Sequence, residues 1–512
     1  MLNDATLAAA AVWLLALVIA SLTVRRWAGP WAHAHPIAAI AGAAAVARAV
    51  PMFALDRGLP FDIEAHWWIG SLALAGRDVY IDPLAAHRYP YPPLLHEYLS
   101  ALLVWLSHGD RALFLILDKA APALCGVGIA VAVRAIACRL GRTSGAALYL
   151  GLLYAVNPLP VLVTAYHGQF EEIPLLGIVL ALLVALPPRA PDRRLVEPRT
   201  ARTVGRFALS ALLLGAAIAY KLWPALFLPP LLLLLYPHAA RGLTRARAVV
   251  RWLGACLLYG ALAALPLVVA IGVYEAAFEH STLLARARQV LSAHGALGHR
   301  VAGDHMLYNM LNYKGSDGFC WGYASVVGKC WDHVYLHANH PNPASKLDGR
   351  LLGVALGAVV LALLWRRRPL EGLVALPLAF YLFTPGWGPN YMIWALPFVV
   401  LLSATLAARY TAVVLPIVAL HYLDSLYAAF NHDNFSWTVL KPLEAALGLL
   451  AWVGVAVILA RTYGAGGKRS QERDSMAVAR AAEPVEPAEL AGLRSAGEPA
   501  YYPIYGAQTR RL

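Results

Sequence analysis

The sequence predicts an all-α membrane protein: a bundle of about 13 transmembrane helices with surface helices in its first external loop. Of the 512 residues, 60% are hydrophobic and only 14% are charged, and the mean hydropathy is +0.59. Soluble domains carry about 25% charged residues, which argues against a soluble fold. The apolar runs extend over 1–462, which we expect to form one transmembrane domain. The tail, 463–512, is rich in Ala, Glu, Pro and Arg and is expected to be disordered and cytoplasmic.

The apolar runs give the transmembrane helices in order, because each is close to the roughly 20 residues that cross a bilayer. The first run, 5–24, starts without a basic segment and is followed by Arg25 and Arg26, so we expect a retained span and no cleaved signal peptide. The other clear spans are predicted at 36–54, 111–137, 145–165, 170–187, 251–275, 350–365, 370–384, 390–408, 411–428 and 441–462.

For two apolar segments, 92–106 and 206–236, the length alone does not decide how often the segment crosses the membrane. The distribution of basic residues decides it, because these residues gather in cytoplasmic loops. Basic clusters occur at 25–26, 134–142, 189–206, 241–251 and 366–368, and in the tail after 461. With all of these on the cytoplasmic side, 92–106 must lie on the outer membrane surface. Segment 206–236 must then cross twice, as two short helices with Lys221 at the outer turn. The same loops explain the net charge of +13, so no nucleic-acid partner is expected.

This topology places the polar and aromatic turns of the chain on one face, the outer one. They are the external loops 55–110 and 276–349, the turns 166–172, 384–391 and 431–437, and Lys221. Cys320 and Cys330 lie in the second loop, where a disulfide is plausible but not required. The other cysteines, Cys125, Cys138 and Cys256, are expected to be inert thiols among apolar residues.

Asp62 is the first candidate for chemistry. Residues 62–75 predict an amphipathic helix with Asp62 at its start, where it is either an N-cap or a general base at the membrane–water boundary. Glu64 could replace it or bind acceptor hydroxyls, and His66 lies one turn away. The Asp-x-Glu spacing also resembles part of a metal site, but without further ligands we expect no metal and no cofactor.

Two further external motifs offer polar groups above the bundle. The turn "YHGQFEE" contains His167, Gln169 and Glu171, which serve either as donors and acceptors for a ligand or as helix caps. Lys221 lies between apolar runs, where a charge is costly unless it meets water or an anion. It is either a lysine that extends to the membrane surface or a clamp for a lipid phosphate. Asp118 either supports packing or lines the cavity.

The motifs "GRDVY", "YPYPPL", "HGQFE", "YKLWP" and "GWGPNY" follow Asp62 in an order that resembles the GT-C glycosyltransferases, and within them glycosyltransferase family 87 and mannosyltransferases. The resemblance covers roughly residues 36–400. It implies Asp62 as catalytic base, His167 and Gln169 in the external turn, and Lys221 at the lipid phosphate. The expected substrate-binding residues are Glu64, His66, Tyr89, Tyr91, His167, Gln169, Glu171, Lys221, Trp387, Asn390 and Tyr391. The span 5–24 and the loop 276–349 depart from the family pattern.

The resemblance implies transfer of a hexose, with mannose as the family-level expectation, from a polyprenyl-phosphate sugar to a lipid- or glycan-linked acceptor. The reaction would invert the anomeric centre on the outer face of a bacterial inner membrane. A nucleotide-sugar donor is not expected, because the chain shows no Gly-rich phosphate loop. Two alternatives remain open: a transporter or flippase of lipid-linked sugars, and a ligase-type transferase that uses a lipid-diphosphate donor.

Overall fold

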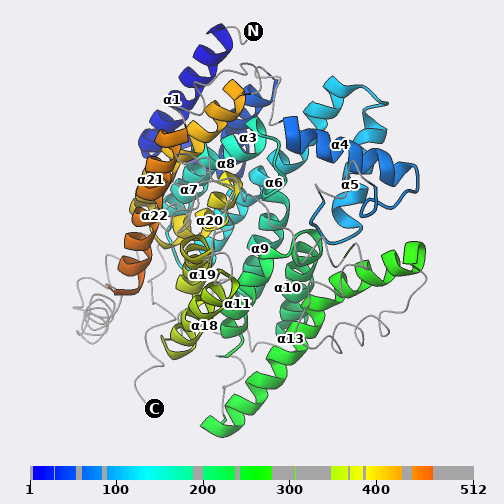
Figure 1. The fold of residues 1–512 in the computed structure, drawn as a ribbon. Helices are drawn as coiled ribbons and strands as arrows, with labels where there is room; N and C mark the ends of the chain where they lie inside the picture. The colour runs from blue at the N-terminus through cyan, green and yellow to red at the C-terminus, as the bar shows by residue number, and fades with distance from the viewer. Residues whose placement is uncertain are drawn as a thin grey trace, which may run out of the picture. The chain divides into compact units, whose positions relative to one another are not determined.

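The structure is a computed structural model that describes residues 4–27, 29–53, 60–82, 89–187, 200–236, 243–279, 306, 348–366, 369–384, 388–428 and 441–464. All regular elements in these residues are helices (Figure 1). The chain divides into two compact units, Met1–Ala456 and Val457–Leu512. Of the second unit, the structure describes only residues 457–464, which form the end of a helix. The fold below is therefore that of the first unit. The predicted tail after residue 464 and the cysteines Cys320 and Cys330 lie outside the described residues.

The helices follow one another with few breaks. The longer ones are α1 (Asp4–Trp27), α3 (Pro36–Phe53), α4 (Pro60–Leu74), α5 (Leu95–Leu106), α6 (Arg111–Arg139), α7 (Ser144–Ala155), α9 (Glu172–Ala185), α10 (Thr200–Tyr220), α13 (Arg245–Tyr274), α18 (Asp348–Arg366), α19 (Pro369–Phe383), α21 (Ala404–Ala428) and α22 (Lys441–Gly464). Short elements join them: α2 (Pro30–Ala34), α8 (Pro158–Pro160), the π-helices η2 (Val161–Tyr166) and η4 (Glu275–Glu279), η3 (Trp223–Phe227), α11 (Leu228–Leu234), η8 (Pro389–Ile393) and α20 (Leu396–Leu402).

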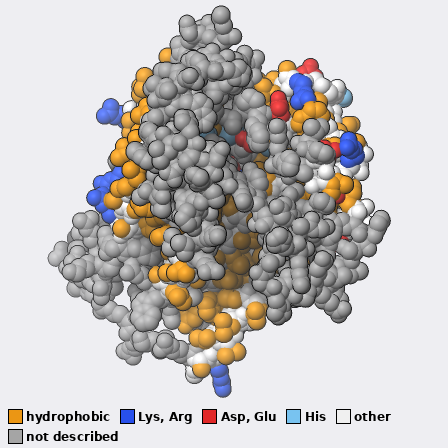
Figure 2. All heavy atoms as spheres, viewed as in Figure 1, with side chains coloured by type: hydrophobic (Ala, Val, Ile, Leu, Met, Phe, Trp, Pro, Cys, Tyr) orange, Lys and Arg blue, Asp and Glu red, His pale blue; other side chains and the backbone are white. Residues whose placement is uncertain are grey.

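Seven helices in the described residues are long and apolar enough to cross a membrane. They are Pro36–Phe53, Arg111–Arg139, Ser144–Tyr166, Thr203–Tyr220, Ala246–Phe278, Ala404–Tyr422 and Leu443–Arg461. Large apolar side chains such as Leu124, Leu257 and Val354 are more than two-thirds exposed, and hydrophobic side chains dominate the described part of the surface in Figure 2. Such a surface suits lipid and not water. The chain is an integral membrane protein, while the total of about 13 spans and their orientation stay predictions.

Helix α6 is central to the packing, since it contacts α3, α7 and α9, while α10 packs between α9 and α13. The predicted break in segment 206–236 is confirmed, because α10 ends at Tyr220 and Lys221 follows it directly. The second half is a short 3-10 turn and a seven-residue helix. The predicted boundary between 390–408 and 411–428 is wrong: the chain breaks earlier, at the extended residue Ser403, and α21 begins at Ala404.

Helices α4 and α5 pair with one another and both also contact α6 (Figure 1). A glycine permits the close approach, because a Cβ on Gly70 would lie 2.4 Å from the carbonyl oxygen of Ser100. Asp62 lies in the first turn of α4, two residues after the helix starts, so it is not the N-cap. The amphipathic pattern of 62–75 predicts His66 on the polar face of this helix, and this prediction is wrong: His66 belongs to the buried face of α4 together with Ala65 and Ile69.

A buried ion pair joins α3 to the start of α9, at the level of the bundle core. Arg48 Nη2 donates to Glu172 Oε1 over 2.8 Å, and both side chains are almost completely buried. Tyr154 and Thr164 each donate a hydroxyl to the same carboxylate over 3.0 Å. Gly126 leaves the space for this pair, because a Cβ there would lie 2.2 Å from Glu172 Oε2. Because each charge is compensated, the pair fixes the position of α9 against α3.

We expect Arg48→Met to lower stability by about 3–5 kcal/mol, because it leaves the Glu172 carboxylate buried without its counter-charge. Thermal unfolding of the purified protein in detergent measures the loss. The double variant Arg48→Met/Glu172→Gln removes both charges and should recover much of it. A double variant less stable than the single one would contradict this account.

Candidate active site

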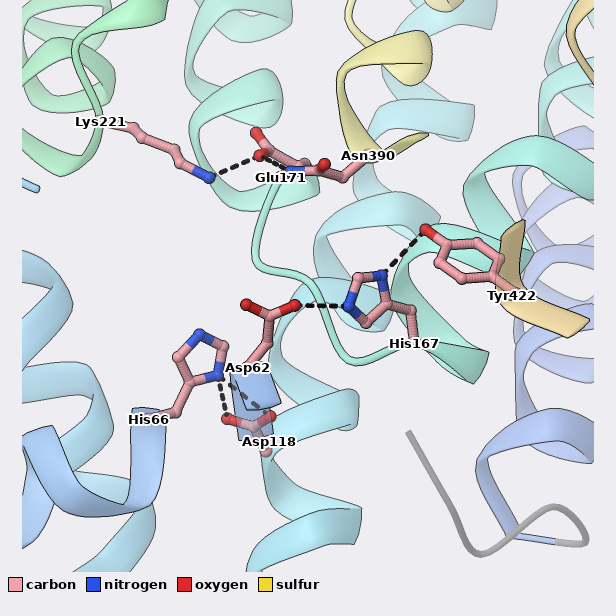
Figure 3. A network of polar contacts seen from close by, with 8 residues as sticks. All are labelled: Asp62, His66, Asp118, His167, Glu171, Lys221, Asn390 and Tyr422. Atoms are coloured by element: carbon pink, nitrogen blue, oxygen red, sulfur yellow. Dashed lines mark hydrogen bonds and ion pairs between the residues drawn. The ribbon is translucent and has the colours of Figure 1, made fainter. Parts of the chain in front are cut away.

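One short turn, between η2 and α9, organises the polar groups in the interior. The π-helix η2 ends at Tyr166, and the amides of His167 and Gly168 still bond back to Leu162 and Thr164 over 3.0 Å. Gly168 has φ +91°, a left-handed conformation that a side chain would strain, and a Cβ there would also contact Ile63 at 3.2 Å. Isolated π-helical turns are rare and often occur at functional sites. The turn lets His167 and Glu171 point to two different polar clusters (Figure 3).

The first cluster is a chain of three residues that starts at Asp62. His167 Nε2 lies 2.7 Å from Asp62 Oδ2, and its Nδ1 lies 2.9 Å from the hydroxyl of Tyr422 (Figure 3). A neutral imidazole has one donor and one acceptor nitrogen. The carboxylate can only accept when ionised, so Nε2 carries the proton and donates to Asp62, and Nδ1 accepts from Tyr422. The three residues therefore fix one tautomer of His167 and one orientation of the carboxylate.

The charges of this cluster follow from its burial and its hydrogen bonds. Burial disfavours the Asp62 carboxylate, but the hydrogen bond from His167, with further contributions from His66 and Gln169, outweighs it and lowers the pKa of Asp62 to about 2. Burial also lowers the pKa of His167, although the contact with Asp62 opposes this. The pair is therefore a charged carboxylate held by a neutral imidazole at physiological pH.

A second carboxylate–imidazole pair lies beside the first. His66 Nδ1 is 3.1 Å from Asp118 Oδ1, both side chains are buried, and the His66 ring stacks on Phe170 at 4.2 Å. Asp118 thus accepts a hydrogen bond from the Nδ1–H group of His66. Asp118 lies on α6, and the sequence left open whether its role is to support packing or to line the cavity. Its contact makes it the group that orients His66 next to Asp62.

The second cluster is centred on Glu171, whose side chain is completely buried. Lys221 Nζ lies 2.5 Å from Glu171 Oε1, and Asn390 Nδ2 donates to the same oxygen over 2.6 Å (Figure 3). Trp394 Nε1 donates to the other oxygen over 3.1 Å. Glu171 therefore binds protein groups on both oxygens. This arrangement positions Lys221 and Asn390, while the expected contact of Glu171 with substrate stays a prediction.

Exposure separates the groups that can meet a ligand from those that support them. Asp62 is 23% exposed and Lys221 is 12% exposed, whereas the side chains of His167 and Glu171 are 3% and 0% exposed. The ammonium of Lys221 also lies 4.8 Å from the ring centroid of Tyr91, within cation–π range. An anionic carboxylate and a lysine ammonium are thus the accessible ends of two buried networks.

The remaining expected residues differ in their placement. Tyr391 is partly buried and stacks on Trp394 at 4.4 Å, next to the Glu171 cluster. Tyr89 is fully buried and donates its hydroxyl to the carbonyl of Pro92 over 3.0 Å, so it supports the packing of its loop. Glu64 is exposed, and a residue two positions from Asp62 points to another face of α4. Trp387 lies outside the described residues.

The sequence analysis did not identify Tyr422 and Trp394 as residues of the site. Tyr422 contacts a residue 255 positions away, and Trp394 one 223 positions away. Both occur inside apolar runs, where an aromatic residue is ordinary core material. The one usable signal for Trp394 is its position three residues after Tyr391, at the end of a motif already noted.

Within the described part of the chain, no group of three or more His, Cys, Asp or Glu side chains could hold a metal ion. In each of the two carboxylate–imidazole pairs, the carboxylate and the imidazole are hydrogen-bonded to each other. They contribute acid–base and hydrogen-bonding groups to the site.

No protein-family model matches the sequence, and none of the curated proteins matches it. Among solved structures, the chain is similar to the crystal structure of ArnT from Cupriavidus metallidurans bound to undecaprenyl phosphate. The two are 14% identical, the match covers 85% of this chain and 79% of that chain, and the TM-score is 0.40. At this level of similarity no function is transferred, and the chemistry of the site must come from its own residues.

Proposed function

We propose that the protein is a GT-C-type membrane glycosyltransferase that moves a hexose from a polyprenyl-phosphate sugar to a lipid- or glycan-linked acceptor. The observation that carries the proposal is one turn, His167–Glu171, that holds Asp62 through His167 and Lys221 through Glu171. A transfer from a lipid phosphate needs a base for the acceptor hydroxyl and a cation for the leaving phosphate. Both groups are present, partly exposed and fixed by the same segment.

Asp62 is the proposed general base. Its carboxylate is ionised at physiological pH, and one of its oxygens, Oδ2, is held by His167. An acceptor hydroxyl that donates to this carboxylate would be aligned for attack on the anomeric carbon. As the new bond forms, the proton passes to Asp62 and the sugar–phosphate bond breaks on the opposite face, so the configuration inverts. General base catalysis of this kind contributes about 10²–10⁴-fold.

Lys221 is the proposed ligand of the lipid phosphate. An ammonium has three N–H donors, and Glu171 takes one of them. The other two have no acceptor among the described residues, so a phosphate oxygen can bind there without displacing Glu171. A developing phosphate dianion needs positive charge more than a proton, which a lysine held beside the site supplies.

Mannose as the sugar, and an active site facing the periplasm of a bacterial inner membrane, belong to the same proposal. A purified preparation incubated with a panel of radiolabelled polyprenyl-phosphate sugars and total membrane lipids tests the sugar and the acceptor together. The expected result is a labelled glycolipid or glycan from one donor only. Absence of any product from every donor would count against a transferase of this class.

A transporter of lipid-linked sugars is the second candidate, because Lys221 lies in a broken helical segment of the kind that transporters use. The two candidates differ in chemistry. A transporter would move labelled lipid across a proteoliposome membrane without cleaving the sugar–phosphate bond. Transfer of label to a second molecule, with the donor consumed, would instead identify the enzyme.

We expect His167→Phe to reduce transfer by about a hundredfold, since the carboxylate loses the group that orients it. The substitution also removes the main cause that lowers the Asp62 pKa, while burial still raises it. Asp62 would then take up a proton at higher pH, and the rate would fall as pH decreases below neutrality. The wild-type rate should show no such acid limb above pH 5, where Asp62 is fully ionised.

Tyr422→Phe is the matched control for this pH profile. It removes only the hydroxyl at the far side of His167 and leaves the contact with Asp62 in place. We expect a much smaller loss of rate and an unshifted profile. An acid limb in Tyr422→Phe equal to that of His167→Phe would show that the imidazole does not set the Asp62 pKa.

A further inference from the structure

A row of side chains connects the proposed base to the proposed phosphate ligand. Asp62 and His66 are one turn apart on α4, so they occupy neighbouring positions of one helix face. The His66 ring lies 5.1 Å from the His96 ring, which in turn lies 4.6 Å from the ring of Tyr91. The Tyr91 ring then lies 4.8 Å from the ammonium of Lys221. A group held between Asp62 and Lys221 would therefore lie along this row.

His66 presents one polar atom of its ring to a ligand. Its Nδ1 donates to Asp118 over 3.1 Å, and Figure 3 shows the ring turned so that Nε2 points away from Asp118. Within the described part of the chain, Nε2 makes no hydrogen bond. It is also not one of the polar atoms that are enclosed without a partner, as Nδ1 of His96 is. A small opening therefore reaches Nε2, in line with the 4% exposure of the side chain.

The contact with Asp118 determines what kind of group this atom can bind. Because Asp118 accepts from the Nδ1–H group, Nδ1 keeps its proton whether the ring is neutral or charged. Nε2 is then an acceptor in the neutral ring and a donor in the imidazolium. A hydroxyl group both donates and accepts, so it matches Nε2 in either state. A phosphate oxygen without a proton only accepts and matches only the imidazolium.

We propose that His66 Nε2 binds one hydroxyl group of the transferred sugar, and that Asp118 is the positioning residue that holds the imidazole for it. This inference rests on the proposed function. In that reaction the acceptor hydroxyl at Asp62 attacks the anomeric carbon on the side opposite the phosphate at Lys221, so the sugar must lie between the two. The protein would then select among hexoses by the hydroxyl group at one ring position.

Competition binding to the full-length protein in detergent tests the hydroxyl contact. The tracer is radiolabelled polyprenyl-phosphate mannose, and the competitors are its unlabelled parent and each monodeoxy analogue. The wild type should bind one analogue about 10–100-fold more weakly than the parent, because that analogue leaves Nε2 without a partner. The other analogues should bind like the parent.

Two substitutions of Asp118 separate positioning from packing. Asp118→Asn keeps an oxygen that can accept from Nδ1–H and should retain the discrimination. Asp118→Ala removes the acceptor and releases the ring, so the discrimination should fall to within about threefold. Sugar-free polyprenyl phosphate should bind to both variants as to the wild type, since Lys221 is untouched, and this binding reports a folded site.

The double variant His66→Phe/Asp118→Asn tests His66 itself, with Asp118→Asn as its matched control. The Phe ring can keep the stacking on Phe170, which the His66 ring makes at 4.2 Å, and no buried charge is left unpaired. The double variant should bind the parent more weakly and should bind the discriminated analogue as well as the parent.

Three results would overturn the proposal. The first is equal affinity of the wild type for the parent and every analogue. The second is discrimination that survives in the double variant, which would assign the hydroxyl contact to another group. The third is full discrimination in Asp118→Ala, which would leave Asp118 without a positioning role. A failure of the proposed enzyme activity would look different: donor would bind with this discrimination, but no product would form in the donor panel.

Discussion

Asp62→Asn is expected to reduce sugar transfer by about a thousandfold, within the range that general base catalysis contributes. Asn keeps the shape of the side chain, and its carbonyl oxygen can still accept from His167 Nε2 as Asp62 Oδ2 does over 2.7 Å. What it loses is the negative charge that accepts the proton of the attacking hydroxyl. The fold and the binding of the donor should survive, because Lys221 and Glu171 are untouched.

The measurement is a comparison of kcat with the dissociation constant of the donor. A base that acts only in the chemical step lowers kcat and leaves donor affinity within about twofold. Glu64→Gln is the matched control, since it removes a carboxylate two residues away on an exposed position of the same helix. It should retain wild-type rates. If Glu64→Gln were the inactive variant and Asp62→Asn active, the base would have to be reassigned to Glu64.

The arrangement around Asp62 was predictable in outline because membrane topology depends on few residues. Arginine positions alone put Asp62, His167 and Lys221 on one face, and the structure brings His167 to 2.7 Å from Asp62. The break at Lys221 was equally visible, since a charged residue and Pro224 interrupt an apolar run too long for one span. These features are local in sequence or are set by the membrane as a whole.

The partners inside the site were not predictable, since they depend on how distant helices pack. Lys221 was expected to meet an anion, and it does, but the anion is the buried Glu171 of the protein itself. Arg48 and Glu172, which are 124 positions apart in the sequence and lie on two different helices, form a core ion pair. No periodicity indicates which buried carboxylate faces which cation. Such pairs follow from the side-chain geometry of the folded bundle.

Lys221→Met is expected to weaken donor binding by about a hundredfold, the value of losing hydrogen bonds to a charged phosphate. It will also destabilise the protein, because the completely buried Glu171 loses the ammonium 2.5 Å away. Removing one partner of a buried pair costs about 3–5 kcal/mol. The two effects must be separated before the first can be assigned to the phosphate.

The double variant Lys221→Met/Glu171→Gln separates them, because it removes the uncompensated charge while the carbonyl oxygen of Gln can still accept from Asn390 or Trp394, both of which donate to Glu171. Its melting temperature should return toward the wild-type value, while donor binding stays as weak as in Lys221→Met. Glu171→Gln alone leaves the ammonium in place and should retain donor binding despite lower stability. A double variant that bound donor like the wild type would mean that Lys221 serves only to neutralise Glu171, and the phosphate would need another cation.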